Sequence, residues 1–277
     1  NTQTSTADAG PYIRLIYGVW DFGAGKLLVG QDYTPEYLGV SGANQAGGSD
    51  SVMLTCGVPY GGRRAQIRLE FGGLHLALVD NVGFSNLGAV DNLAAAATTE
   101  KMLPKIAVSY KMKLDPVALT FAGSYFTYDI ERGTFPDLEV DAYYLGGRAV
   151  VKLGPATLKG VLYYAQNGNE LALTAGGTDG ATTVLGGTTA AYVVDNDTIG
   201  FAITGSYKFS DMVQFEAGWG KFSAEMDDSS SAGIGSGATT TEDERIGYYL
   251  QSTITLAKGV YIVPEIGKID FKTSARG

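Results

Sequence analysis

The stretch that decides the fold is PKIAVSYKMKL, residues 104–114. Its even-numbered residues from 106 to 114 are Ile, Val, Tyr, Met and Leu, whereas its odd-numbered residues from 105 to 113 are three lysines, one alanine and one serine. Side chains of a β-strand alternate between its two faces, so this strand would be apolar on one face and basic on the other. The stretch therefore predicts a strand that separates an apolar environment from water.

The same two-residue alternation recurs along the whole chain, and the joins between the alternating segments fall into two classes. Every other join is a tight turn, and five of these six turns contain Gly or Pro, such as Gly72-Gly73, whereas the remaining joins are long and polar, such as 167–195 and 224–243. Short turns at one end and long loops at the other are typical of a membrane β-barrel. The twelve predicted strands are 12–22, 26–33, 63–71, 74–81, 104–114, 117–129, 139–153, 156–166, 196–209, 213–223, 244–257 and 259–271.

Composition agrees with a barrel, although a soluble β-protein would share the mean hydropathy of +0.04. No apolar run in the 277 residues approaches the ~20 that a membrane helix needs, and a closed barrel is the other structure whose backbone groups all pair inside a bilayer. Polar faces rich in Lys and Thr, with Tyr and Phe near strand ends, favour a barrel over a β-sandwich. We therefore predict an all-β chain that forms one antiparallel transmembrane β-barrel domain, 1–277, surrounded by the lipid and lipopolysaccharide of a bacterial outer membrane.

Several function classes are disfavoured by the same residues. The formal net charge of −9 argues against nucleic acid as a partner, because phosphate contacts need clustered positive charge. The single Cys56 allows neither an intrachain disulfide nor a cysteine metal cluster. His75 is the only histidine, and no Gly-x-Ser-x-Gly elbow accompanies it. We expect no catalytic residues, no metal site, no cofactor and no enzymatic activity.

Two neighbouring stretches share a pattern of glycine turns and basic residues. RLIYG at 14–18 leads into WDFGAGKLLVGQDYTP at 20–35, and GGRRAQIRLEFGGL follows at 61–74. Together they resemble the fourth to sixth strands of the trimeric general porins of Gram-negative bacteria. The resemblance implies that the intervening loop, 34–62, folds into the lumen and narrows the pore. The chain departs from the enteric pattern at Gln31, where those porins usually carry a basic residue.

The resemblance also implies a count of strands. The twelve segments would correspond to strands four to fifteen of a sixteen-stranded barrel, with three strands before them and one after. The turn pattern agrees, because the first predicted strand ends at a short turn and the twelfth follows one, so an odd number of strands is expected beyond each. The porin family further implies a homotrimer. The alternatives are a complete twelve-stranded outer-membrane enzyme or ligand-specific channel, and a secreted β-sandwich surface protein.

The charged residues on the predicted inner face indicate a function. A basic wall opposite acidic loop residues sets a transverse field in a pore, and rings of basic residues favour anions; the simpler alternative is that these side chains only solvate a polar face. We expect passive diffusion of small hydrophilic solutes and ions, with a mild preference for anions. The pore-lining and constriction candidates are Arg14, Arg64, Arg68, Asp32, Glu36, Asp50 and Glu70. Further basic candidates for the lumen are Lys105, Lys111, Arg148, Lys152 and Lys159.

Overall fold

The computed structural model describes residues 13–43, 53–54, 56–81, 98–171, 173, 183–185, 192–226 and 242–272. All its regular elements are strands. No helix in these residues is long and apolar enough to cross a membrane. The strands are β1 (Ile16–Asp21), β2 (Lys26–Tyr33), β3 (Arg63–Phe71), β4 (Leu74–Val79), β5 (Thr98–Glu100), β6 (Lys105–Leu114), β7 (Val117–Arg132), β8 (Phe135–Leu153), β9 (Ala156–Gln166), β10 (Thr183–Leu185), β11 (Tyr192–Val194), β12 (Asn196–Lys208), β13 (Val213–Met226), β14 (Glu242–Ala257), β15 (Val260–Ile262) and β16 (Glu265–Phe271).

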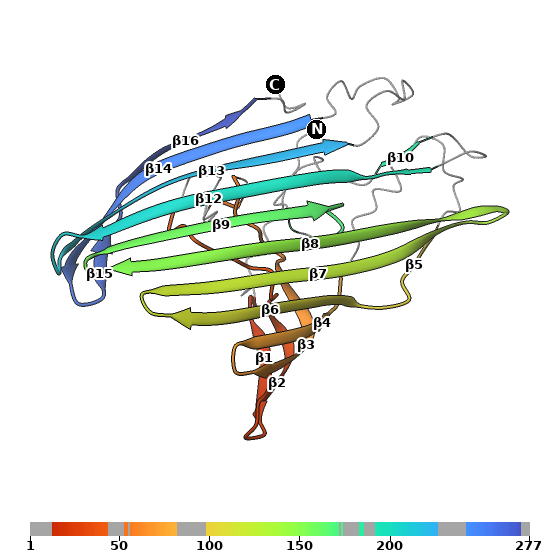
Figure 1. Cartoon of the computed structure of the whole chain (residues 1–277), viewed down its shortest axis with the longest axis horizontal. Coiled ribbons are helices and arrows are strands. Elements are labelled where there is room, and N and C mark those ends of the chain that lie inside the picture. Colours follow the sequence, from red (N-terminus) through yellow and green to blue (C-terminus); the bar gives the residue numbers. More distant parts are fainter. Residues whose placement is uncertain are drawn as a thin grey trace.

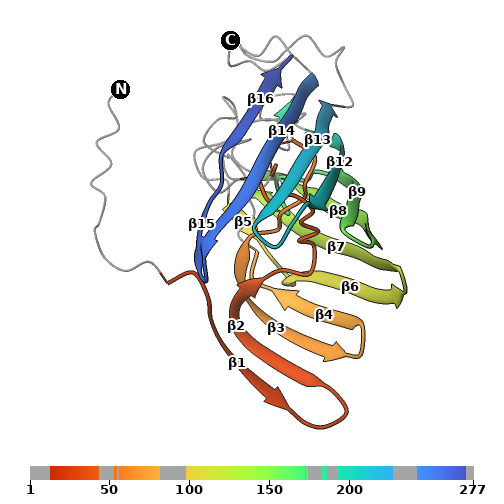
Figure 2. The same cartoon turned by 90° about the vertical axis from the view of Figure 1, so that its left-hand side faces the viewer.

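Fourteen of these strands form one antiparallel sheet in which successive long strands are neighbours. The order is β1-β2-β3-β4-β6-β7-β8-β9-β12-β13-β14-β15, with β16 added to β14 and β5 added to β7. The sheet curls strongly, so that the β1–β4 region stands at a steep angle to β12–β16 (Figures 1 and 2). All twelve predicted segments are found as strands, the last of them divided into β15 and β16.

The structure differs from the predicted boundaries mainly between β7 and β8. The sequence suggested a long polar join there, but the two strands continue as a hairpin that closes at Gly133, whose φ of 67° suits a tight turn. They span 16 and 19 residues, more than the roughly 9–11 needed to cross a bilayer, and the hairpin extends past its neighbours in Figure 1. The short strands β5, β10 and β11 were not predicted, because three residues carry too little periodicity.

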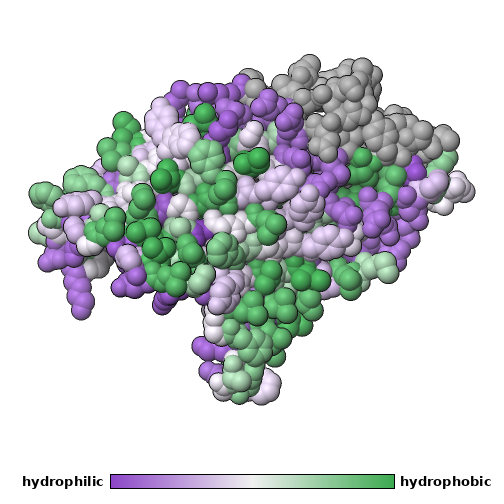
Figure 3. All heavy atoms as spheres, in the orientation of Figure 1, coloured by the Kyte–Doolittle hydropathy of each residue, from purple (hydrophilic) through white to green (hydrophobic). Residues whose placement is uncertain are grey.

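The two faces of the sheet have the polarity opposite to that of a soluble protein. Large apolar side chains on the outer face are exposed, for example Ile67 at 52%, Leu145 at 67% and Leu162 at 60%. On the inner face, polar side chains such as Thr204 and Gln251 are buried. In the space-filling view, apolar residues cover the middle of the visible face and the projecting region of β1 and β2 (Figure 3). Such a surface suits lipid rather than water.

Aromatic side chains stand toward both ends of the apolar outer face. Near the tight turns, the Phe22 ring packs edge to face against Trp20 and Phe71, with 5.8 Å between centroids in each pair. Toward the long loops, Tyr125 lies directly opposite Tyr143 on the neighbouring strand. Tyr125 is eight residues from the start of β7, which corresponds to about 27 Å along the strand. Because the strands of such barrels tilt by roughly 35–45°, this length corresponds to about 20 Å across the bilayer, and aromatic side chains near both ends of the apolar face are typical of membrane β-barrels.

Candidate functional site

The segment between β2 and β3, residues 34–62, is the centre of the inner side of the sheet. Its two ends meet, because the Thr34 amide donates a hydrogen bond to the Gly62 carbonyl at 3.2 Å. From this neck, the described part of the segment folds across the inner face, where Leu38, Val40, Met53 and Val58 are almost fully buried. Residues 34–43, 53–54 and 56–62 of the segment belong to the described structure. We refer to 34–62 as the inner loop.

A buried ion pair holds the first part of the inner loop. The Glu36 carboxylate lies 2.8 Å from the Lys105 ammonium, and both side chains are fully buried. Lys105 also donates to the Leu171 carbonyl at 3.2 Å, and the Tyr144 hydroxyl donates to the Glu36 carbonyl at 3.4 Å. Two charges removed from water are stable only when they remain paired. Lys105 therefore holds the loop in place and has no contact with water in this structure.

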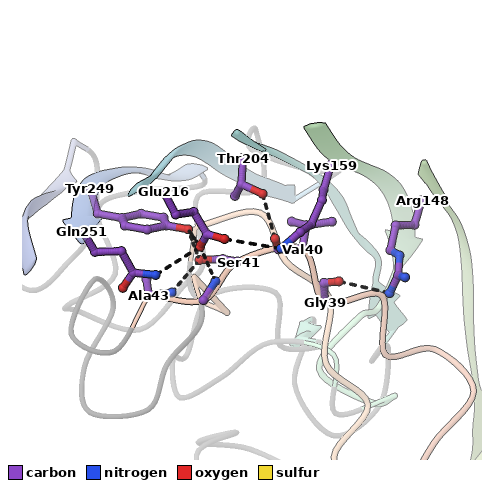
Figure 4. Close-up of polar contacts among 11 residues, drawn as sticks. Gly39, Val40, Ser41, Ala43, Arg148, Lys159, Thr204, Glu216, Tyr249 and Gln251 are labelled. Atoms are coloured by element: carbon purple, nitrogen blue, oxygen red, sulfur yellow. Dashed lines mark hydrogen bonds and ion pairs between the residues drawn. The ribbon is translucent and has the colours of Figure 1, made fainter. Parts of the chain in front are cut away.

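A carboxylate on β13 holds the next part of the inner loop (Figure 4). Glu216 accepts hydrogen bonds from the Gly42 amide at 2.7 Å, the Tyr249 hydroxyl at 2.6 Å and the Gln251 side-chain amide at 3.2 Å. The Lys159 ammonium lies 3.4 Å from its second oxygen. Bonds to an ionised acceptor are stronger than neutral ones, and here they converge on one side chain. Glu216 therefore connects three strands, β9, β13 and β14, to the loop.

Neighbouring contacts extend this anchorage along both sides of Glu216. The Ser41 hydroxyl donates to the Tyr249 oxygen at 2.7 Å, and the Thr204 hydroxyl donates to the Val40 carbonyl at 2.7 Å. The Arg148 guanidinium donates to the Gly39 carbonyl at 3.1 Å (Figure 4). The loop backbone thus forms hydrogen bonds with side chains of the strands at successive residues, as buried backbone groups require.

Glycines let the far part of the inner loop approach the wall closely. A Cβ added to Gly57 would overlap the Phe201 carbonyl, and one added to Gly220 would overlap the Cys56 carbonyl. A Cβ on Gly247 would lie 2.6 Å from the Cys56 sulfur. Cys56 itself is fully buried. At each of these points, one of the two segments in contact needs a residue without a side chain.

The rings of three inner-face tyrosines each pack directly against a glycine. The Tyr163 ring covers Gly200, its directly opposite partner on β12, and the Tyr249 ring covers Gly218 on β13 in the same way. Tyr144 covers Gly146 of its own strand β8. The three tyrosines are at most 3% exposed, so each ring fills the space that the missing glycine side chain leaves. These pairs form the apolar floor beneath the inner loop.

A second inward segment follows β9 and was not predicted. The join 167–195 was expected to be a polar loop outside the sheet, but Glu170, Leu171 and Leu173 are buried within the core. The Tyr128 hydroxyl donates to Glu170 at 3.1 Å, and the Tyr60 amide of the inner loop donates to the Leu173 carbonyl at 3.4 Å. The segment therefore packs against the inner loop from the side of the long loops.

On the opposite side of the inner loop, toward the tight turns, a cavity of about 460 Å³ remains. One wall is the beginning of the loop with Tyr33 and Tyr37, and the other is the inner face of β3, β4, β6, β7 and β8. Four cationic side chains and one carboxylate line it. These charged residues are Arg68, Lys111, Lys113, Arg148 and Asp32.

Arg68 differs from the other cations of the cavity because its charge is already compensated. Its guanidinium lies 2.8 Å from Asp32 and 2.8 Å from Glu70, and it donates to the Tyr33 carbonyl at 3.0 Å. Lys111 and Lys113 take part in none of the ion pairs found among the described residues. The free positive charge of the cavity therefore lies on β6 and β8.

Solved structures of outer-membrane proteins share this architecture. The outer membrane channel DcaP of Acinetobacter baumannii aligns with 97% of this chain and 72% of its own, with a TM-score of 0.67 and 13% identity. The trimer form of OmpT, an outer membrane protein of Vibrio cholerae, aligns with 96% and 73%, with a TM-score of 0.57 and 17% identity. The fold is that of an outer-membrane β-barrel. No family model and no curated protein matches the chain.

The barrel fold and its apolar outer surface place the protein in the bacterial outer membrane, as the sequence predicted. The inner face of the sheet is then the side of the lumen, and residues 36–42 of the inner loop contact β6, β8, β12 and β13 on that face. Within the described ranges, no group of three or more His, Cys, Asp and Glu side chains is arranged to hold a metal ion.

The structure places the remaining candidate residues of the barrel as follows. Arg64 lies on β3 two residues from the buried Gln66, hence on the inner face. Lys152 is exposed near the turn that follows β8. Arg14 differs from the expectation, because β1 begins only at Ile16; it is exposed ahead of the strand, and its carbonyl accepts a bond from Gln31. Asp50 lies outside the described residues.

Sequence reasoning missed the side chains that hold the loop. Glu216, Tyr249 and Thr204 lie within predicted strands, but none of them is among the predicted site residues. One signal was present, since an acidic residue within a strand face otherwise rich in Gly and aromatic residues needs a partner. The partner itself could not be identified, because Gly42 lies 174 residues away along the chain.

We expect the Glu216→Ala substitution to release the loop around Gly42, because it removes the acceptor shared by three donors and one ammonium. Hydrogen–deuterium exchange should become at least tenfold faster at residues 40–43, about 1.4 kcal/mol of lost protection. Glu225→Ala serves as the matched control, since Glu225 is exposed on the same strand. Equal exchange in both variants would show that Glu216 does not hold the loop.

Proposed function

We propose that this protein is a passive channel that conducts ions and small hydrophilic solutes across the outer membrane. The observation that carries the proposal is the polarity of the sheet, with exposed apolar side chains outside and buried polar side chains inside. A polar interior within a lipid-facing wall is what a diffusion pore requires. The description of DcaP as an outer membrane channel supports the proposal, although at 13% identity the likeness extends to the fold alone.

The proposed assembly is a homotrimer of the porin type. The resemblance of 14–35 and 61–74 to general porins supports it, and the trimer form of OmpT shows that a related fold assembles in this way. Reconstituted into planar lipid bilayers, the protein should produce stepwise current increases in groups of three, and its conductance should rise smoothly with salt concentration. A preparation that inserts without conducting would refute the channel; single, independent steps would refute only the trimer.

A mild preference for anions is the proposed selectivity. Inner-face cations outnumber the carboxylates near them in the cavity, where three of the four have no carboxylate partner among the described residues. Basic groups around a narrow passage raise the local concentration of anions. In a salt gradient, the reversal potential should therefore have the sign expected for anion flow.

Charge reversal at Arg64 tests this selectivity. Arg64 lies on the inner face of β3, and none of the ion pairs among the described residues involves it. We expect Arg64→Glu to move the reversal potential toward cations, because it changes the local charge of the passage by two units. Lys258→Glu makes the same change in the exposed turn after β14 and should shift the potential less. Equal shifts would show that Arg64 does not face the conduction path.

A ligand-specific channel is a second candidate function. His75, the only histidine of the chain, lines the cavity directly opposite Ser109 on β6, but the Ser109 hydroxyl is buried without a hydrogen-bond partner, so the two side chains do not form a nucleophile–base pair. The cavity itself favours some selectivity for ligands, because it combines aromatic, hydroxyl and cationic groups in one enclosed space.

A further inference from the structure

The cavity beneath the inner loop is lined by cationic, hydroxyl and aromatic side chains, a combination that is typical of binding sites for small molecules. We propose that it binds small organic carboxylates that carry a planar apolar group, and that these solutes pause there during permeation. The inference rests on the proposed channel function and adds a saturable site with a defined ligand class. It follows from the position of the free cations, the aromatic wall opposite them and the size of the space.

The cationic side of the site is one continuous row across three strands. Lys111 on β6 is paired in register with Thr120 on β7, and Thr120 with Arg148 on β8. Neighbouring strands lie about 4.8 Å apart, so the backbones of Lys111 and Arg148 are separated by about 10 Å, with Thr120 between them. All three residues line the cavity. A carboxylate between Lys111 and Arg148 would meet two cations and one hydroxyl donor.

The cations of this row have few competing partners. Arg148 donates one hydrogen bond to the Gly39 carbonyl, while its Nε is buried without a hydrogen-bond partner. Lys111 forms no ion pair within the described residues, and Lys113 adds a further positive charge two residues along β6. A buried donor without an acceptor is costly, and a bound anion would satisfy it. Arg68 is unavailable in this sense, because Asp32 and Glu70 occupy its guanidinium.

The aromatic side of the site comes from the neck of the inner loop. Tyr33 and Tyr37 stack with 5.3 Å between ring centroids, and Tyr60 packs edge to face against Tyr37 at 5.5 Å. Tyr33 and Tyr37 both line the cavity, which the wall of β6–β8 closes on the other side. Planar groups associate well with aromatic rings, and a volume of about 460 Å³ holds a small molecule. The site is therefore built for an anion with a flat apolar body.

Benzoate is the probe, with acetate as the matched anion that lacks the ring. In single-channel recordings in chloride salt, benzoate should reduce the small-ion current in a saturable, concentration-dependent manner. Lys111→Met should raise the half-blocking concentration at least tenfold, because it removes one of the two cations that hold the carboxylate. Tyr33→Leu should weaken block by benzoate and leave the weaker effect of acetate unchanged.

Lys152→Met is the control for general wall charge. Lys152 is a cation of β8, like Arg148, but it does not line the cavity. Its replacement should leave the half-blocking concentration of benzoate within twofold of the parent value. If Lys152→Met and Lys111→Met weaken the block equally, the anion responds to the overall charge of the wall, and the inference is wrong.

The outcomes also separate this inference from the channel proposal. Current without saturable benzoate block overturns the site and leaves the channel intact. Absence of any current overturns the channel proposal. In that case, the site is tested independently by calorimetric titration of benzoate into the detergent-solubilised protein. Heat of binding that Lys111→Met abolishes and Lys152→Met preserves would support the site, and no heat in the parent protein would overturn it.

Discussion

The Lys105→Met variant should lose about 3–5 kcal/mol of unfolding free energy, because it leaves the Glu36 carboxylate buried without a cation. Both side chains are fully buried, so water cannot replace the missing partner. Urea unfolding of the protein in lipid vesicles, followed by tryptophan fluorescence, would measure the loss. The inner loop should also leave its position, since Glu36 is its first point of attachment.

Two further variants make this expectation specific. Lys105→Met combined with Glu36→Leu replaces the ion pair with apolar groups and should recover most of the stability, as buried pairs often allow. Lys208→Met removes a surface pair with Asp211, whose two side chains are 55% and 96% exposed, and should cost less than about 1 kcal/mol. If the Lys105 and Lys208 variants were equally stable, the buried pair would have no structural role.

Excision of the inner loop should produce a severalfold larger conductance. The Thr34 amide already bonds to the Gly62 carbonyl, so a Gly-Gly linker in place of residues 36–60 can join the ends without moving β2 or β3. The excision removes Glu36 together with the loop, and Lys105 then faces a water-filled lumen rather than a dry core. The reason for the larger conductance is geometric, because the loop occupies the interior that a barrel of this kind otherwise leaves open.

Single-channel conductance and the size limit for neutral polyols would both report this change. Glu216→Ala is the useful comparison, because it loosens the loop without removing it; its mean conductance should stay close to the parent value while its current noise increases. An excised variant with unchanged conductance and an unchanged size limit would mean that the loop does not narrow the conduction path.

The strands could be predicted from the sequence because their pattern is local. In 105–114, the alternation of apolar and polar residues indicates which face each side chain occupies. The predicted start and end of β6 are within one residue of those observed. The alternation does not indicate how far a strand continues beyond the membrane. β8 starts four residues before the predicted residue 139, because Gly133 closes the hairpin between β7 and β8. β1 starts later than predicted, at Ile16.

The candidate site could be predicted only in part, since its contacts join distant parts of the chain. Glu36 and Lys105 were both named for their charge and face, but their pairing across 69 positions was not visible in either stretch. The same is true of Leu171 and Leu173, because they stand in a long join that shows no alternating pattern. Residue type indicated which face a charge occupies, whereas packing decided whether that charge meets water or a partner.

The tyrosines that lie over glycines have a consequence for how this barrel can change in evolution. A methyl group at Gly200 would collide with the ring of Tyr163, so an alanine can appear there only together with a smaller residue at 163. Gly218 and Tyr249 are coupled in the same way across β13 and β14. Related sequences should therefore inherit these positions as pairs, with covariation between columns that lie directly opposite in the sheet. We expect a single substitution at either member of a pair to be disfavoured, because it would leave either an overlap or an unfilled space in the apolar floor beneath the inner loop.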